Sequence, residues 1–233
     1  MLDRAKHETI LKNILRDVYQ HPRLGAQLAF KGGTCLFLFH GLPRFSTDLD
    51  FTLVIEDEGD AFDPHPMGKI LADYLTLIED RQKRFTWFWL GGYEKGLQRV
   101  KVEISKRQFS DQFALQDYLG ITVRTLDLAT MFAHKLVEVS ERRALVNRDL
   151  YDTWWLLKKM APIHEEIIVE RTGKTLIEHL HFLLSYIPEN VDQRHIIAGL
   201  GELLSRPQKD WARDHLFDEL MAQIKIRIEA EET

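Results

Sequence analysis

Two acidic residues placed two positions apart carry the clearest chemical signal in the sequence. Asp48 and Asp50 open the segment 48–55, whose apolar and β-branched residues predict a β-strand. Alternate residues of a strand point to the same face, so the two carboxylates converge. Converging carboxylates repel each other unless a cation lies between them, and Mg²⁺ takes oxygen ligands of this kind. The pair therefore predicts a divalent metal site that also contacts substrate phosphates.

A glycine pair precedes this strand in the segment Lys31–Thr34, which reads Lys-Gly-Gly-Thr. The glycines separate a predicted short strand, Gln27–Phe30, from a predicted short helix, Cys35–His40, for which Thr34 is the expected cap. Without Cβ atoms the backbone can approach a phosphate closely. A helix N-terminus adds free N–H groups and a favourable dipole. Together with the Thr34 hydroxyl, these features predict a cradle for a triphosphate.

Each of these signals also has a structural explanation. A Gly-Gly pair is usually a turn, and an Asp-x-Asp pair is usually a solvated strand end. Their conjunction is more specific, because a strand, a Gly-Gly-Thr turn, a helix and a strand with two carboxylates follow one another in the order that nucleotidyl transfer needs. We therefore interpret the conjunction as functional.

The elements that must position these residues divide the chain in two. The first half is predicted to contain an amphipathic helix over about the first 20 residues, a helix at Met67–Ile78, an antiparallel hairpin of Phe85–Leu90 with Arg99–Ile104, and a strand at Ile121–Leu126. The second half is predicted to contain helices near residues 127–142, 148–160, 163–170, 175–186, 192–205 and 210–230. The expected fold class is α+β, with a mixed sheet and flanking helices in residues 1–125 and a helical half in residues 126–233.

Composition excludes several classes of protein. The chain has 233 residues, of which 45% are hydrophobic and 29% charged, so it is not a disordered chain. Its net charge of −5 argues against a uniformly basic nucleic-acid binder but permits local basic patches. The single cysteine, Cys35, excludes a disulfide framework and any zinc site that needs two thiolates. A secretory segment and an apolar run of about 20 residues are both missing, which predicts a cytoplasmic protein without a membrane partner.

The two motifs resemble a known family. Lys-Gly-Gly-Thr at 31–34 with Arg-x-Ser-x-Asp-x-Asp-Phe at 44–51 is similar to the AbiEii/AbiGii toxins, which are nucleotidyltransferases of the DNA polymerase β type in abortive-infection and toxin–antitoxin systems. The resemblance covers residues 30–55 and 128–157 well and residues 99–105 moderately. It implies a nucleotidyltransferase-type sheet, a two-metal Mg²⁺ site, an NTP substrate and a separately encoded antitoxin. Residues 160–233 are expected to form a helical cap that frames the acceptor.

The resemblance also implies a third carboxylate on a neighbouring strand. Glu103, within the alternating segment Val100–Ile104, is the matching residue. It would complete the metal site or act as general base. A solvated strand residue is the alternative interpretation.

Two charged residues in the helical half are further candidates. Lys135 falls in the middle of the apolar stripe of the helix expected from Asp127, and a lysine on a buried face needs a partner. That partner is either a core carboxylate or, as the family-like Ala-x-Lys-Leu element implies, the triphosphate. The segment 148–152, Arg-Asp-Leu-Tyr-Asp, resembles another family element and implies an active-site role for Asp149, which would position Lys135. Asp152 is a weaker candidate, because the helix dipole alone favours acids in a first turn.

Arg44 and Ser46 lie between the glycine turn and the carboxylate pair. Arg44 is expected to contact phosphate. Ser46 is expected to bind nucleotide or to cap a turn, and its hydroxyl is also a candidate for a modification that switches activity off. Basic residues that form either solvated faces or a surface for RNA cluster at Lys95, Arg99, Lys101, Lys106 and Arg107, and at Arg142, Arg143 and Arg148.

The sequence therefore predicts a Mg²⁺-dependent enzyme that transfers NMP from NTP to an RNA hydroxyl and acts as a toxin, with tRNA 3′ ends as the acceptor that the resemblance implies. Two other functions stay open: transfer to a protein or small-molecule hydroxyl, and a non-catalytic NTP-binding regulatory module, against which the intact Asp-x-Asp argues. The predicted metal ligands are Asp48, Asp50 and Glu103. The predicted catalytic residues are these three with Lys135 and Asp149. The predicted nucleotide-binding residues are Lys31, Gly32, Gly33, Thr34, Arg44, Ser46 and Lys135.

Overall fold

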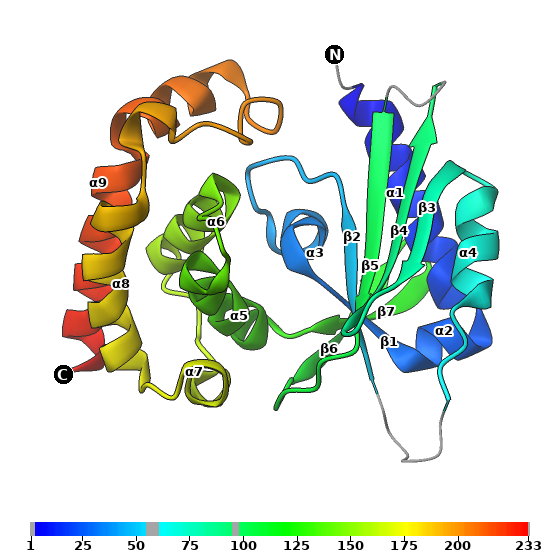
Figure 1. The fold of residues 1–233 in the computed structure, drawn as a ribbon, viewed down its shortest axis with the longest axis horizontal. Helices are drawn as coiled ribbons and strands as arrows, with labels where there is room; N and C mark the ends of the chain where they lie inside the picture. Colours follow the sequence, from blue (N-terminus) through cyan, green and yellow to red (C-terminus); the bar gives the residue numbers. More distant parts are fainter. Residues whose placement is uncertain (1–2, 55–60, 95–97, 233) are drawn as a thin grey trace. The chain divides into compact units, whose positions relative to one another are not determined.

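The structure is a computed structural model that describes residues 3–54, 61–94 and 98–232 (Figure 1). The chain forms two compact units. The first consists of Met1–Gly41, Phe45–Gln108 and Gln112–Leu126, and the second consists of Leu42–Arg44, Phe109–Asp111 and Asp127–Thr233. The main change of unit therefore falls between Leu126 and Asp127, while two three-residue segments from earlier in the chain join the helical unit.

A seven-stranded mixed sheet forms the first unit, in the order β3-β4-β5-β2-β1-β7-β6. The strands are β1 (Leu28–Lys31), β2 (Leu49–Leu53), β3 (Thr76–Gln82), β4 (Thr86–Tyr93), β5 (Gln98–Ser105), β6 (Phe113–Tyr118) and β7 (Ile121–Leu126). The pairs β1/β7 and β2/β5 are parallel, and the other neighbours are antiparallel. The predicted mixed sheet and the predicted β4/β5 hairpin are confirmed.

Helices lie on both faces of this sheet (Figure 1). They are α1 (Arg4–Gln20), α2 (Pro22–Gln27), α3 (Gly32–His40) and α4 (His65–Ala72). Helices α1, α2 and α4 lie on one side of the sheet and α3 lies on the other. Helix α3 contacts β1 and β2, so the glycine turn that begins α3 stands over the two central strands. These strands carry Lys31 and Asp50 of the predicted site.

The second unit is helical. It consists of α5 (Leu128–Glu141), α6 (Asn147–Lys158), α7 (Glu165–Thr172), α8 (Leu176–Asn190), the 3-10 turn η1 (Gln193–His195) and α9 (Arg206–Glu231). Helix α6 packs against α5 and α9, and α8 packs against α7 and α9. The Asp127 carboxylate caps α5 by accepting a hydrogen bond from the Thr130 N–H at 2.7 Å. Across the described residues, no helix combines the length and apolar character that crossing a membrane requires.

Two predicted helices differ from those observed. The helix predicted at Met67–Ile78 ends at Ala72, and Thr76–Gln82 forms β3 instead. Pairing with β4 decides the outcome, because the side chains of β3 alternate between more and less exposed positions in a way that suits a sheet edge. The helix predicted at 192–205 is only the short turn η1 followed by further turns, since Gly199 adopts a φ of 74° that ends helical geometry.

Four smaller features also differ from the predictions. Helix α2 and strand β6 were not predicted from the sequence pattern. Thr34 does not cap the helix, because α3 begins at Gly32, three residues before the predicted start at Cys35, with Lys31 at its N-cap. The strand predicted over residues 48–55 is observed as Leu49–Leu53, and residue 55 lies outside the described part of the chain.

Candidate active site

The register of the sheet brings two of the predicted carboxylates together. Asp50 on β2 pairs with Lys31 on β1 and, on its other side, with Glu103 on β5. Paired residues of neighbouring strands project from the same face, so these three side chains form one row. Asp48 lies just before β2, two residues from Asp50, and belongs to the same face. The parallel pairing of β2 with β5 therefore places Glu103 beside the Asp-x-Asp pair.

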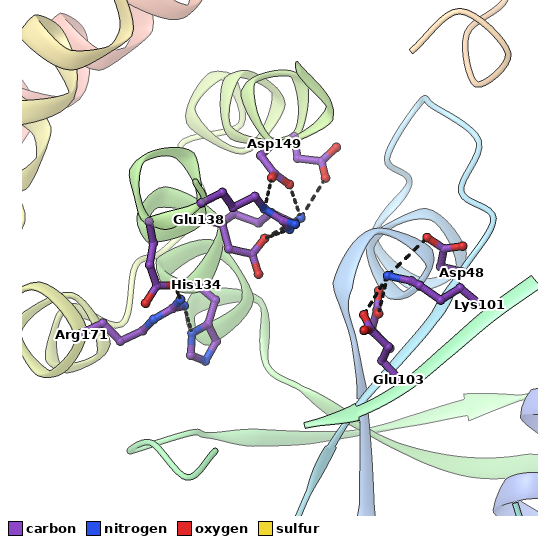
Figure 2. A network of polar contacts seen from close by, with 12 residues as sticks. Asp48, Lys101, Glu103, His134, Glu138, Asp149 and Arg171 are labelled. Carbon is purple, nitrogen blue, oxygen red and sulfur yellow. Dashed lines mark hydrogen bonds and ion pairs between the residues drawn. The ribbon is translucent and has the colours of Figure 1, made fainter. Parts of the chain in front are cut away.

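A lysine ammonium lies among these carboxylates (Figure 2). Lys101 Nζ donates a hydrogen bond to Glu103 Oε2 at 2.8 Å. It also lies 3.7 Å from Asp48 Oδ2 and 3.8 Å from Asp50 Oδ1. Lys101 reaches this position because it is two residues from Glu103 on β5 and shares its face. We call Asp48, Asp50, Glu103 and Lys101 the carboxylate cluster.

Burial and charge shift the pKa values inside the carboxylate cluster. Burial works against the charged form of Lys101, but the charges of Asp50, Asp48 and Glu103 outweigh it and raise the pKa of the ammonium. Burial is also the main reason why the pKa of the Asp50 carboxyl is raised. The Asp48 and Glu103 charges raise it further, and the Lys101 ammonium opposes them. The cluster is thus a set of acids that needs a cation and holds a protonated lysine.

The donor chemistry of the cluster fits a divalent metal ion. Its three carboxylates supply the oxygen ligands that Mg²⁺ and related hard cations prefer, and they already surround the ammonium of Lys101. As the side chains stand, no three acidic, His or Cys groups of the described residues are arranged to hold a metal by themselves. The ammonium of Lys101 occupies the space between the three acids.

The glycine turn lies directly against this cluster. Gly32 has a φ of +79°, in the left-handed region that favours glycine. A Cβ at this position would lie 2.8 Å from Asp50 Oδ2 and 3.2 Å from Asp50 Cβ. Only glycine therefore lets the start of α3, with Gly33 in its first turn, approach the carboxylate this closely. The helix N-terminus and the acids adjoin each other, as binding a phosphate and its metal ion together requires.

Thr34 and Ser46 are buried beside the cluster. The Thr34 hydroxyl lies 2.9 Å from Ser46 Oγ and donates a hydrogen bond to the main-chain carbonyl of Asp48. Both side chains are almost fully buried, at 1% and 6% exposure. Their observed contacts hold the segment that leads into β2, and a contact of either hydroxyl with nucleotide stays a prediction.

His7 on α1 also supports this segment, although no motif of the sequence pointed to it. Its Nε2 lies 3.0 Å from the Thr47 carbonyl oxygen and its Nδ1 lies 2.8 Å from the Tyr93 hydroxyl. A carbonyl only accepts hydrogen bonds, so Nε2 carries the proton and Nδ1 accepts from Tyr93. Burial lowers the pKa of His7, which favours this neutral form. The available signal was its spacing, since His7 precedes the apolar residues Leu11 and Ile14 on the same helix face.

In the helical unit, Lys135 lies among acidic side chains, of which Glu138 and Asp149 are labelled in Figure 2. Its Nζ donates to Asp149 Oδ1 at 2.9 Å and to Glu138 Oε2 at 3.0 Å. Asp152 Oδ2 is 3.4 Å away. Burial opposes the charge of the ammonium, but Asp149 and the neighbouring acids outweigh it, so the pKa of Lys135 is raised. The structure thus brings Lys135 and Asp149 into contact, and their catalytic roles stay predictions.

Two arginines complete this network. Arg44 Nε and Nη2 lie 2.5 Å and 2.6 Å from the two carboxylate oxygens of Asp152, in a pair whose side chains are 3% and 0% exposed. Arg142 Nε lies 2.8 Å from Asp149 Oδ2. At least two N–H groups of Arg44 therefore donate to Asp152. A contact of Arg44 with phosphate stays a prediction. The carboxylate cluster belongs to the first unit, and the Lys135 network belongs to the second.

Comparisons with known proteins agree with this fold. A candidate nucleotidyltransferase from H. pylori is similar over 100% of this chain and 97% of its own, with 18% identity and a TM-score of 0.61. JHP933 from Helicobacter pylori is similar over 100% of this chain and 96% of its own, with 18% identity and a TM-score of 0.57. At such identity the likeness establishes the nucleotidyltransferase fold alone.

The sequence itself identifies the family. No curated protein matches the sequence of this chain. The family model described as the nucleotidyl transferase AbiEii toxin of type IV toxin–antitoxin systems matches residues 13–225. This match spans both units, including the helices after residue 160 for which the sequence motifs gave no assignment. The chain therefore belongs to the AbiEii nucleotidyl transferase toxin family.

Proposed function

We propose that this chain is a Mg²⁺-dependent nucleotidyltransferase that transfers NMP from NTP to a hydroxyl group of RNA, with the 3′ end of tRNA as its acceptor. The observation that carries the proposal is the convergence of Asp48, Asp50 and Glu103 on a single cation position beside the Gly32 turn. Family membership supports the transferase chemistry and implies an antitoxin partner. We place the reaction in the cytoplasm, where NTP and tRNA are both available.

In the proposed reaction the acceptor hydroxyl oxygen forms a bond to the α-phosphorus of NTP. The bond between the α-phosphorus and the bridging oxygen to the β-phosphate breaks, and pyrophosphate leaves. Metal ions held by Asp48, Asp50 and Glu103 would neutralise phosphate charge when bound. The hydroxyl proton passes to a carboxylate, for which Glu103 is the candidate if it does not complete the metal site.

Substrate positioning is assigned to residues at the start of α3 and to charged side chains. The N–H groups at the start of α3, with Gly32 and Gly33, are suited to phosphate oxygens. Lys31, paired in register with Asp50, adds a positive charge beside them. We assign Lys135 to the triphosphate because of its family-like motif and because its acidic partners keep it charged. Asp149 acts here as a positioning residue for Lys135.

An RNA acceptor is favoured by a basic and aromatic surface on the strands next to Glu103. Phe88 on β4 is paired with Glu103 in register, and Lys83 Nζ lies 3.7 Å from the centre of the Phe88 ring. The exposed Phe85 ring lies between two guanidinium groups, those of Arg84 at 4.8 Å and Arg107 at 5.1 Å. Rings that stack on bases, with cations that contact phosphates, suit single-stranded nucleic acid.

The predicted basic residues contribute unequally to this surface. Arg107 lies on the Phe85 ring. Lys106 Nζ lies 4.6 Å from the centre of the Trp87 ring, but Trp87 is paired with Ile104 and projects from the face opposite to Phe88 and Glu103, so Lys106 lies outside this surface. Lys101 and Arg142 are instead engaged with acids. Lys95 lies outside the described residues. The acceptor surface that we propose therefore consists of the loop between β3 and β4 and the end of β5.

Labelled nucleotides test this proposal. The full chain is incubated with each α-labelled NTP, Mg²⁺ and total tRNA, and the Asp48→Ala variant serves as the inactive control. We expect label on RNA with at least one NTP, and none with the variant. Label that appears only on protein or on an added metabolite would favour the second class of acceptor. Tight NTP binding without turnover would favour a regulatory module, and label on RNA that survives Asp48→Ala would contradict the assigned site.

A further inference from the structure

We propose that Lys101 is an internal counter-cation, which holds the three acids of the carboxylate cluster together before a metal binds and leaves them when the divalent cation enters. The inference rests on the metal site of the proposed function. It adds to that function an exchange step, in which one positive charge of the chain gives way to the metal ion. Lys101 is thus a positioning residue for Asp48, Asp50 and Glu103.

The position of the ammonium supports the first half of this proposal. Lys101 Nζ makes a 2.8 Å hydrogen bond to Glu103 and lies within 3.8 Å of both Asp48 and Asp50. The β2/β5 register holds the backbones of Glu103 and Asp50 opposite each other, and Asp48 directly precedes β2, so the three acids stay in one neighbourhood. Three carboxylates confined in this way repel one another, and the lysine relieves that repulsion.

The dimensions of a metal site support the second half. Mg²⁺ requires carboxylate oxygens at roughly 2.1 Å in a nearly octahedral arrangement. The ammonium now occupies the space from which these oxygens would be reached. A lysine and a divalent cation in the same cluster would also repel each other. The two cations therefore exclude each other, and metal binding is an exchange rather than a simple addition.

The Lys101 side chain can move out of the carboxylate cluster. Its side chain is 31% exposed, so one side of the cluster is open to water. The charge lies at the end of a flexible four-carbon stem, whereas the shorter side chain of Asp50 is attached to a backbone that strand pairing holds in place. A released ammonium is hydrated without any change in the backbone. The exchange thus needs only a rotation of one side chain.

This exchange makes two measurable predictions. A variant without the ammonium binds the metal more tightly, because nothing has to be displaced. In the unchanged protein, the Lys101 amine becomes more reactive when the metal binds, because it loses its acidic partners. A lysine that remains in the cluster as a permanent ion pair would not show the second effect.

The first measurement uses Mn²⁺ as the probe, with free Mn²⁺ counted by electron paramagnetic resonance and no NTP present. The proteins are the full chain, Lys101→Met, and Lys12→Met as a matched control. Lys12 is also a lysine of the first unit in an ion pair, with Glu8 on α1, so its loss changes the net charge equally. We expect Lys101→Met to lower the Kd for Mn²⁺ by about tenfold or more, since like charges in one site strongly oppose each other. Lys12→Met should leave the Kd within about twofold.

The second measurement uses only the unchanged protein and remains valid if Lys101→Met fails to fold. Brief acetylation with and without Mn²⁺, followed by mass spectrometry of the peptides, reports the reactivity of each lysine. We expect acetylation of Lys101 to rise several-fold with Mn²⁺, while that of Lys12 stays constant. Unchanged or reduced reactivity of Lys101 would overturn the exchange.

The outcomes also separate this inference from the proposed function. If the full chain and Lys101→Met bind Mn²⁺ with equal affinity, the exchange is wrong while the metal site stands. If neither protein binds Mn²⁺, the metal site and the exchange are both wrong. If transfer to RNA fails but the two Mn²⁺ measurements succeed, the acceptor is wrong and the exchange stands.

Discussion

The space that a side chain would need at Gly32 is taken by the carboxylate of Asp50. A Cβ at residue 32 would lie 2.8 Å from Asp50 Oδ2, and the backbone there has a φ of +79°. The glycine turn and the acid pair are therefore one site rather than two adjacent motifs. Any side chain at position 32 must either move the carboxylate or shift the start of α3.

Gly32→Ala should consequently reduce both activity and stability. We expect nucleotidyl transfer to fall by at least about 100-fold, because small displacements of reacting groups cost about this much. Unfolding free energy should fall by about 1 to 3 kcal/mol, the cost of a non-glycine residue in this backbone region. Label transfer and urea unfolding measure the two effects.

Gly41→Ala is a matched control for this variant. Gly41 has a φ of +76°, and a Cβ there would meet nothing within 4 Å. The Gly41→Ala variant should lose about as much unfolding free energy as Gly32→Ala while it keeps its activity. Equal losses of activity in the two variants would show that backbone strain, and not the contact with Asp50, explains the effect.

Local sequence rules were sufficient for the glycine turn and the acid pair. The period of two along a strand places Asp48 and Asp50 on one face, and a strand that turns into a helix favours glycine. Glu103 required the family resemblance, because no local rule states that β5 pairs with β2. The same limit explains Lys101, which the sequence groups with basic residues and the register places among acids.

Tertiary contacts decided the features that the sequence did not predict. Thr76–Gln82 becomes a strand because β4 is available for pairing, although the apolar spacing before it suits a helix. Arg44 lies four residues before Asp48 in the sequence, yet it joins the helical unit through Asp152. His7 supports Thr47 across 40 residues of sequence. Strand β3 depends on its neighbour β4, whereas Arg44 and His7 depend on partners that lie far away along the chain.

Asp48→Asn should remove one ligand of the proposed metal site without changing the size of the side chain. We expect transfer to fall by more than the roughly 100-fold that loss of an outer-shell partner can cost. EDTA should abolish the transfer by the unchanged protein, and added Mg²⁺ should restore it. Asp117→Asn on β6, an exposed acid outside the cluster, serves as control and should retain full activity. Activity of Asp48→Asn close to that of the control would exclude Asp48 as a ligand.

Arg44→Met should destabilise the protein strongly. The change removes the cation closest to the fully buried Asp152 carboxylate. The Lys135 ammonium is more distant, at 3.4 Å. We expect a loss of about 3 kcal/mol, since removal of one partner exposes the cost of a buried charge. The double variant Arg44→Met/Asp152→Leu should recover much of the loss, because no unpaired charge remains.

Urea unfolding measures these changes, with Arg213→Ala as a control. Arg213 forms an exposed ion pair with Asp210, and such pairs contribute less than about 1 kcal/mol. An Arg44→Met variant as stable as this control would contradict a structural role for the Arg44–Asp152 pair.

Stability should decrease as the solution is acidified, and His7 should contribute to the decrease. Burial lowers the pKa of His7 below its ordinary value of 6.5, and the same holds for His179. Below pH 6.5 the unfolded chain therefore takes up protons at these positions while the folded chain does not, so acid favours unfolding until the lowered folded pKa is reached. Each histidine contributes at most about 1.4 kcal/mol per pH unit.

Urea unfolding of the unchanged protein and of His7→Gln between pH 7.5 and 5.5 measures the effect. The variant should be less stable at pH 7.5, and its stability should fall less steeply because only His179 of the two remains. An identical slope for both proteins would contradict a neutral, buried His7 that holds the Thr47 carbonyl beside the carboxylate cluster.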